Sequence, residues 1–161
     1  MSARPAAVEI AHPPQAVLRV VNPLLRAALR APLLGSALKD FMVVTFTGRK
    51  TGRRFAIPVS AHHINGDLYV LLNAGWKYNF RDGAPVEVRH GGSSTTMSGQ
   101  LITDSAVVAE LARRAAVSYG AKKAQRSMGL KFRDAEIPTS ADFAEASNRL
   151  GLAAIRLTPA V

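Results

Sequence analysis

The sequence predicts a mainly β protein with flanking helices, an α+β chain built around an antiparallel barrel. Short runs of β-branched and aromatic residues recur between turn residues, helical patterns are few, and none of them joins two strands as a parallel crossover would. At 161 residues and 48% hydrophobic composition, the chain has the size of one domain with its own core. We expect a flexible Pro- and Ala-rich leader over residues 1–14 and a single domain over residues 15–161.

Residues 15–31 have the pattern of a basic amphipathic helix. Apolar residues recur at helical spacing, whereas Arg19, Arg26 and Arg30 share another face. Asn22-Pro23 marks a restart, because Asn is a good N-cap and Pro is favoured at the first helical position. Two interpretations stay open: the apolar face packs on the core and leaves the arginines in water, or the basic face lies near an anionic membrane surface.

Five strands are expected in the middle of the chain. Asn65-Gly66 is a favoured type I′ hairpin turn, so the first three strands should form an antiparallel meander, and Gly91-Gly92 turns the chain between the last two. The predicted strands are Phe41–Thr47, Arg54–His63, Leu68–Asn73, Pro85–Arg89 and Thr95–Ile102.

The last third of the chain is predicted to be mostly helical. Asp104 or Ser105 caps a helix whose apolar residues continue at helical spacing to Tyr119. The segments expected after it are a short helical or irregular stretch at Ala121–Leu130, a surface loop at Lys131–Pro138, a short helix near Ala141–Arg149 and a final strand at Leu152–Leu157.

Charge and cysteine content restrict the chemistry. The net charge is +10, and residues 1–54 hold nine Lys or Arg against two acids, so the excess lies early in the chain. Such a charge suits nucleic acid, an anionic membrane or a phosphorylated small ligand. Without cysteine the chain has no disulfide, thiolate metal site or cysteine nucleophile. The N-terminus lacks the apolar run of a secretory signal, and no stretch is long enough to span a bilayer, so we expect a cytoplasmic protein, peripheral to the membrane at most.

The segment Thr47–Arg54, TGRKTGRR, is a cationic turn between two predicted strands. It places four cations within six residues, and Gly48 and Gly52 allow a tight turn and close approach to a ligand. Arg and Lys are the residues that bind phosphate oxygens, and Thr51 adds a hydroxyl donor. The glycine spacing is wrong for a Walker loop. The turn is either a phosphate site or a solvated hairpin tip.

The ordered motifs around this turn resemble the deazaflavin-dependent nitroreductase family. They are the TGRKTGR turn, the strand containing Ile57-Pro58-Val59, the Asn-Gly-Asp turn, an apolar strand, and the Trp76–Val86 segment with its W-x-x-N-x-R pattern. The resemblance covers residues 41 to about 103. It implies an FMN-binding-like split β-barrel and an oxidoreductase in which coenzyme F-420, FMN or FAD delivers hydride to a hydrophobic acceptor such as a quinone, nitroaromatic or activated alkene.

The resemblance also implies roles for particular residues. Arg49, Lys50, Thr51 and Arg53 would hold the cofactor phosphate, and Pro58, Val59 and Ser60 would line the flat ring. Ala74, Gly75, Trp76 and Asn79 would close the groove. In this chain Leu72–Gly75 leads almost directly to Trp76, where family members have a longer loop that contacts the cofactor. This departure leaves open which of the three cofactors is used, and whether redox activity is retained.

Other candidate residues and functions are less favoured. Tyr119 and Tyr78 could each give a proton to a reduced substrate, or simply pack as phenols, and Trp76 could equally be a core residue. We expect no metal site, because His62 and His63 point to opposite faces of a strand and lack further ligands at suitable spacing. A non-catalytic cofactor carrier of the same fold is the alternative function. A basic nucleic-acid-binding barrel is less favoured, because no aromatic-rich strand face suggests stacking on bases. The oligomeric state stays open.

Overall fold

The structure is a computed structural model of the chain, and it describes residues 6–10, 41–90, 93–134 and 136–160. The predicted helix over residues 15–31, its restart at Asn22-Pro23 and the Gly91-Gly92 turn lie outside the described residues. Contacts among residues group into two compact units, a division that the sequence did not indicate. The barrel unit lies within Pro13–Val70, Ala74–Leu101 and Ile155–Val161, and the helical unit within Met1–His12, Leu71–Asn73 and Ile102–Ala154.

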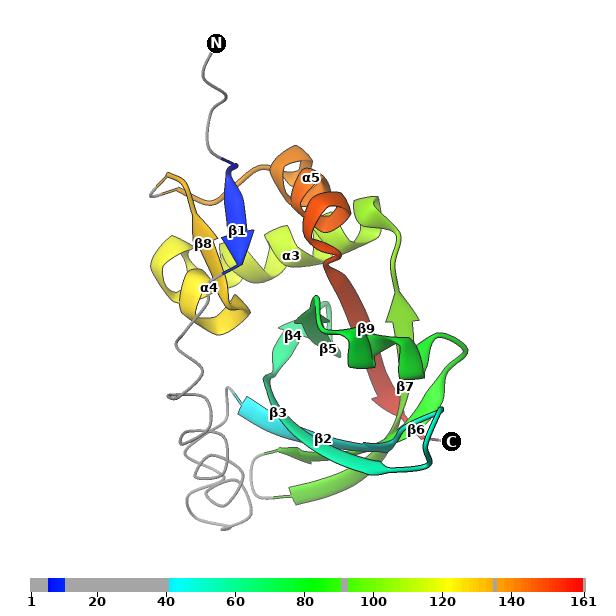
Figure 1. Cartoon of the computed structure of the whole chain (residues 1–161). Coiled ribbons are helices and arrows are strands. Elements are labelled where there is room, and N and C mark those ends of the chain that lie inside the picture. Colours follow the sequence, from blue (N-terminus) through cyan, green and yellow to red (C-terminus); the bar gives the residue numbers. More distant parts are fainter. Residues whose placement is uncertain (1–5, 11–40, 91–92, 135, 161) are drawn as a thin grey trace, which may run out of the picture. The chain divides into compact units, whose positions relative to one another are not determined.

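The barrel unit is built on a seven-stranded antiparallel sheet that curls into a half-barrel (Figure 1). This confirms the predicted α+β class and the split-barrel architecture. The strand order is β3-β2-β6-β7-β9-β5-β4. These strands are β2 Phe41–Thr47, β3 Arg54–Ser60, β4 His62–Ile64, β5 Asp67–Leu72, β6 Ala84–His90, β7 Ser93–Ile102 and β9 Ala153–Pro159.

One predicted strand is wrong in a way that explains the curl. The run Arg54–His63 is not continuous: it breaks at Ala61 into β3 and β4, which lie at opposite edges of the sheet. The meander of three neighbouring strands is therefore also wrong, since β3 pairs with β2 whereas β4 pairs with β5. Because a single residue joins strands at the two edges, the sheet has to curve until those edges approach each other.

Alternating residues of the central strands form the core of the barrel unit. In β2, Met42, Val44 and Phe46 are at most 3% exposed, and Val44 pairs with Val88 of β6, which is equally buried. The period of two places these side chains on one face of the sheet. The Asn65-Gly66 turn between β4 and β5 has positive φ at both residues, 54° and 83°, as a type I′ turn requires.

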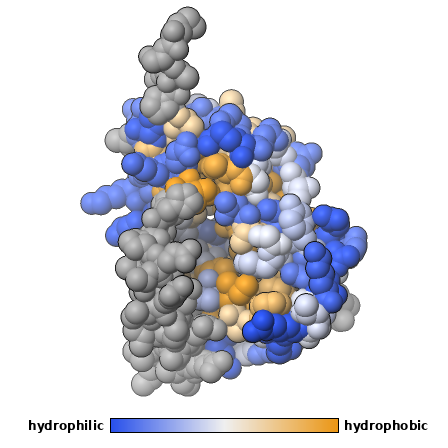
Figure 2. Space-filling model, in the orientation of Figure 1, coloured by the Kyte–Doolittle hydropathy of each residue, from blue (hydrophilic) through white to orange (hydrophobic). Residues whose placement is uncertain are grey.

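The helical unit packs three helices against a two-stranded ribbon. Its helices are α3 Ser105–Tyr119, α4 Ala121–Met128 and α5 Ser140–Leu150, and its ribbon pairs β1 Val8–Ile10 with β8 Leu130–Phe132. The predicted cap of α3 is confirmed, because the Asp104 carboxylate accepts hydrogen bonds from the backbone of Ala106 and Val107. In the orientation of Figure 2 the surface of this unit is mostly hydrophilic, with some hydrophobic residues among the hydrophilic ones.

The ribbon corrects two expectations. Residues 8–10 were expected in a flexible leader and residues 131–132 in a surface loop, yet both segments are strands. Val8 is 1% exposed, and its carbonyl accepts a hydrogen bond of 2.6 Å from Arg149 of α5. Each strand is only three residues long, so the local sequence carries little signal, and the pairing of distant segments decides the structure.

Candidate functional site

The β2–β3 hairpin ends in a tight six-residue turn, residues 48–53, that presents the cationic segment. The backbone N–H of Gly48 donates to the carbonyl of Arg53 at 2.7 Å, and the N–H of Gly52 donates back to Gly48 at 3.0 Å. Gly52 has a φ of +69°, which favours glycine. The Thr51 hydroxyl oxygen accepts a hydrogen bond from the Arg53 backbone at 3.2 Å. These bonds define the shape of the turn.

The Trp76 segment forms a short 3-10 helix, η1 Gly75–Phe80, and its rings pack on the sheet. Trp76 stacks on Phe46 of β2 with ring centroids 5.3 Å apart, and Phe80 meets the same ring edge-on at 5.1 Å. Phe55 of β3 lies 5.7 Å from Phe46 on another side. Phe46 and Phe80 are buried, whereas Phe55 is 36% exposed and Trp76 is half-buried. Trp76 thus packs on the core, as one of its two expected roles requires, and it also reaches the surface.

Hydrogen bonds fasten the turn to η1. The Asn79 side-chain oxygen accepts from the backbone N–H of Arg49 at 2.8 Å, and its amide nitrogen donates to the carbonyl of Trp76 at 2.8 Å. The Arg49 guanidinium donates to the carbonyl of Tyr78 at 3.1 Å and lies 3.8 Å from the Asp82 carboxylate. The Asn79 side chain therefore joins the turn to η1.

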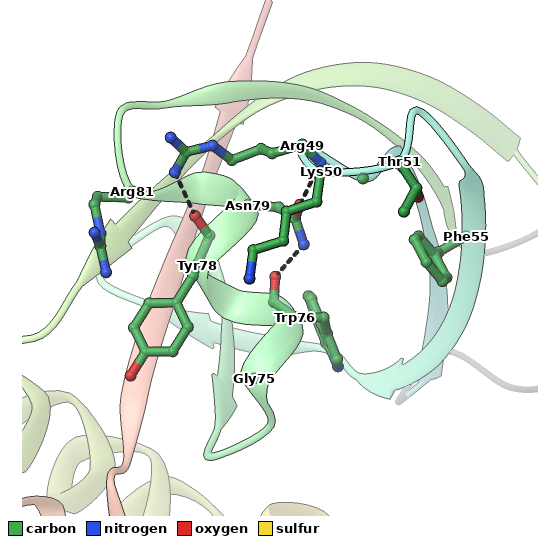
Figure 3. Close-up of a pocket in the computed structure, with 10 residues that line it drawn as sticks. Arg49, Lys50, Thr51, Phe55, Gly75, Trp76, Tyr78, Asn79 and Arg81 are labelled. Atoms are coloured by element: carbon green, nitrogen blue, oxygen red, sulfur yellow. Dashed lines mark hydrogen bonds between the residues drawn. The ribbon is translucent and has the colours of Figure 1, made fainter.

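A cavity of about 730 Å³ lies between the turn and η1 (Figure 3). Its volume is within the usual range for small-molecule sites. The lining combines cations with aromatic rings and backbone of the two segments. The lining residues are Gly48, Arg49, Lys50, Thr51, Phe55, Gly75, Trp76, Tyr78, Asn79 and Arg81.

The other two cations of the segment Thr47–Arg54 are Arg53 and Arg54, and each has a contact of its own. The Arg53 guanidinium lies 5.9 Å from the centre of the Phe55 ring. Arg54 donates to Glu87 of β6 at 3.1 Å, and the Ser94 hydroxyl donates to the same carboxylate at 2.7 Å. Neither arginine lines the cavity described above. The four cations of the sequence motif thus divide into two that border the cavity and two that do not.

The structure brings most of the predicted site residues together. Those that line one cavity are Arg49, Lys50, Thr51, Gly75, Trp76, Tyr78 and Asn79. Those outside its lining are Arg53, Pro58, Val59, Ser60 and Ala74, although Ala74 caps η1 through a hydrogen bond from Lys77 to its carbonyl. Tyr119 belongs to the helical unit, where it packs against the core. The Lys123 ammonium lies 5.5 Å from the centre of its ring.

Three lining residues were not among the predicted site residues: Gly48, which was expected only to allow the tight turn and the approach of a ligand, Phe55 and Arg81. Arg81 was part of the W-x-x-N-x-R pattern, so its charge beside a cationic turn was the available signal. The Arg81 guanidinium lies 5.1 Å from the centre of the Tyr78 ring. Phe55 gave no such signal, since an aromatic residue at the start of a strand is ordinarily a packing residue. A Cβ on Gly48 would lie 2.8 Å from the Phe55 ring, so that ring would have to shift if the glycine were replaced.

His62 is a buried titratable group of the barrel unit that lies outside the cavity lining. His62 is 1% exposed, and burial lowers its pKa from 6.5 to about 4, with a further contribution from the charge of His63. Over the described parts of the chain, no group of three or more His, Cys, Asp or Glu side chains could hold a metal ion. Within the same parts, no helix is long and apolar enough to cross a membrane.

The fold and the cavity define an α+β split-barrel protein with a cavity lined by cations and aromatic rings. No protein-family model matches the sequence, and a search among curated proteins finds no match. Among solved structures, a Mycobacterium protein described as a domain-swapped dimer matches with a TM-score of 0.44 and 14% sequence identity. The match covers 90% of this chain and 99% of that one.

Proposed function

We propose that this protein binds a phosphorylated flavin-type cofactor, coenzyme F-420 or a flavin, and acts as an oxidoreductase on a hydrophobic acceptor. The observation that carries the proposal is the composition of one cavity. Exposed cations from the turn and Arg81, which directly follows η1, line the same cavity as Phe55, Trp76 and Tyr78. A ligand that joins an anionic group to a flat aromatic ring satisfies both features at once.

The residues present fit such a cofactor by their chemistry. Lys50 and Arg81 offer charged donors suited to phosphate oxygens, and the Thr51 hydroxyl offers another. One face of Trp76 is occupied by Phe46, so its ring is held in place while it borders the cavity. When bound, the cofactor would supply the hydride. This chain would contribute binding, orientation and electrostatics, which is the usual contribution of a protein in cofactor chemistry.

The lining itself holds few groups for acid–base chemistry. Among the described lining residues there is no carboxylate or histidine. Apart from arginine, threonine, tryptophan and asparagine, the proton-bearing side chains of the lining are those of Tyr78 and Lys50. Tyr78 is 46% exposed, so it is accessible to a substrate. A mechanism in which the cofactor carries the redox step is compatible with this lining.

The single tryptophan makes the first test direct. Trp76 is the only tryptophan of the chain and lines the cavity, so its fluorescence should report ligand binding. We expect saturable quenching on titration with F-420, FMN or FAD, after correction with free N-acetyl-tryptophanamide at matched absorbance. Absence of saturable quenching, together with no heat of binding by calorimetry for all three compounds, would refute the proposal.

Turnover separates an enzyme from a carrier. The cofactor that binds is supplied in its reduced form, and its oxidation is followed with menadione, a nitroaromatic and an activated alkene as acceptors. Acceptor-dependent oxidation above the rate without protein supports the oxidoreductase. Tight binding without turnover across the panel would favour the non-catalytic carrier. Salt-sensitive retention on nucleic acid with no cofactor binding would favour a nucleic-acid-binding barrel instead.

A further inference from the structure

The two turn cations that line the cavity have different surroundings. Arg49 is held by the protein: its guanidinium donates to the Tyr78 carbonyl at 3.1 Å and lies 3.8 Å from Asp82, while its backbone N–H donates to Asn79 at 2.8 Å. The Asp82 carboxylate offsets part of its charge. An anion that recruited this guanidinium would compete with contacts that join the turn to η1.

Lys50 and Arg81 remain available to a ligand. Among the described residues, the Lys50 ammonium has no hydrogen-bond or ion-pair partner, and in Figure 3 its side chain extends into the cavity. The Arg81 guanidinium lies over the Tyr78 ring at 5.1 Å, and its N–H groups have no hydrogen-bond acceptor within the described parts of the chain. A cation stacked on a ring keeps the donors along its edge, so this contact does not prevent phosphate binding.

We propose a division of roles within the cavity: Lys50 and Arg81 contact the anionic group of the ligand, whereas Arg49 and Asn79 are positioning residues that hold the turn against η1. This inference rests on the proposed function, since it assigns the contacts of that ligand. It differs from what the sequence motif implies, because Arg49 stands beside Lys50 in the motif and Arg81 lies 31 positions further along the chain.

The salt dependence of binding distinguishes the two roles. F-420 and FMN are titrated by Trp76 fluorescence between 25 and 300 mM KCl, and pyrophosphate, which has no ring, is titrated by calorimetry. Lys50→Ala and Arg81→Ala should each weaken binding about tenfold or more at low salt, and should make Kd less sensitive to KCl, because a screened ionic contact is lost. Asn79→Ala should weaken binding while leaving the salt dependence unchanged.

Two further variants serve as matched comparisons. Arg53→Ala removes one cation from the same turn, outside the cavity, and should bind within about twofold of the parent. Arg49→Gln removes the charge but keeps a side-chain amide that can donate to the Tyr78 carbonyl, so it should retain the salt dependence of the parent. Circular dichroism checks that each variant is folded.

The possible results separate this inference from the proposed function. If the parent binds a cofactor but Lys50→Ala and Arg81→Ala bind equally well, or if Arg49→Gln loses salt dependence as strongly as Lys50→Ala, the division of roles is wrong while the function stands. If the parent binds pyrophosphate alone, with the expected pattern among variants, the roles stand and the cofactor proposal fails. Binding of none of these probes overturns both.

Discussion

Burial of the His62 side chain should make the barrel unit lose stability as the pH falls. His62 lies in β4, directly opposite Tyr69 of β5, and is 1% exposed. Desolvation, with a smaller effect of the neighbouring His63, lowers its pKa from 6.5 to about 4. In the unfolded chain the imidazole takes up a proton near pH 6.5, so between pH 6.5 and 4 the unfolded state binds more protons than the folded state.

The sign and size of the effect follow from this difference. Stability that depends on neutral His62 is fully present above pH 6.5, falls as the pH decreases, and is lost near pH 4. With the two pKa values given, the loss relative to neutral pH amounts to about 2 kcal/mol at pH 5 and about 3 kcal/mol at pH 4. Such a loss is a large fraction of the stability of an ordinary domain.

Urea unfolding at pH 7.5 and pH 5.0 measures this effect, with Trp76 fluorescence as the signal because Trp76 and His62 belong to the same unit. On this change of pH, the free energy of unfolding of His62→Gln should fall by about 2 kcal/mol less than that of the parent. This corresponds to a difference of about 1 M in the shift of the urea midpoint. His63→Gln is the control: it leaves His62 buried, so most of the pH dependence should persist. Equal losses in the parent and in His62→Gln would refute the reasoning.

Two smaller perturbations test the packing of each unit. A Cβ on Gly99 would lie 2.7 Å from the Phe80 ring, so Gly99→Ala should destabilise the barrel unit by about 1–3 kcal/mol in urea unfolding. Gly75→Ala, where a Cβ meets nothing within 4 Å, is its control, and equal effects would contradict the steric argument. Thr139→Ala removes half of the capping box that Thr139 forms with Asp142 at the start of α5. It should cost about 1 kcal/mol, seen as faster hydrogen exchange in α5, and unchanged exchange would show that the cap contributes little.

Most elements could be predicted because their signals are local. The β-branched and aromatic run of β2 favours a strand wherever it lies, and Asp104 caps α3 through bonds to residues two and three positions away. Strand neighbours could not be predicted in the same way. Whether residues 54–63 form one strand or two depends on which distant segments pair with each half, so the break at Ala61 leaves no signal in the local sequence.

The candidate site shows the same distinction. The sequence predicted a tight cationic turn followed by the Trp76 segment, and seven of the predicted site residues line one cavity. It could not indicate that Arg54 would donate to Glu87, 33 positions away, or that Asn79 would accept from the backbone of Arg49. Partners of this kind are set by which strands lie side by side.

By itself, the sequence determined the α+β class, most of the strands and helices, the excess of positive charge and the position of the cationic turn, because each depends on residue type and short-range spacing. Only the tertiary structure decided the order of strands in the sheet, the pairing of β1 with β8, and the partner of each cation in the turn. These depend on contacts between residues far apart in the chain. Four cations that look equivalent in TGRKTGRR thereby acquire different surroundings: Arg49 and Arg54 lie near carboxylates and Arg53 near the Phe55 ring, whereas Lys50 borders the cavity with no ion-pair partner among the described residues.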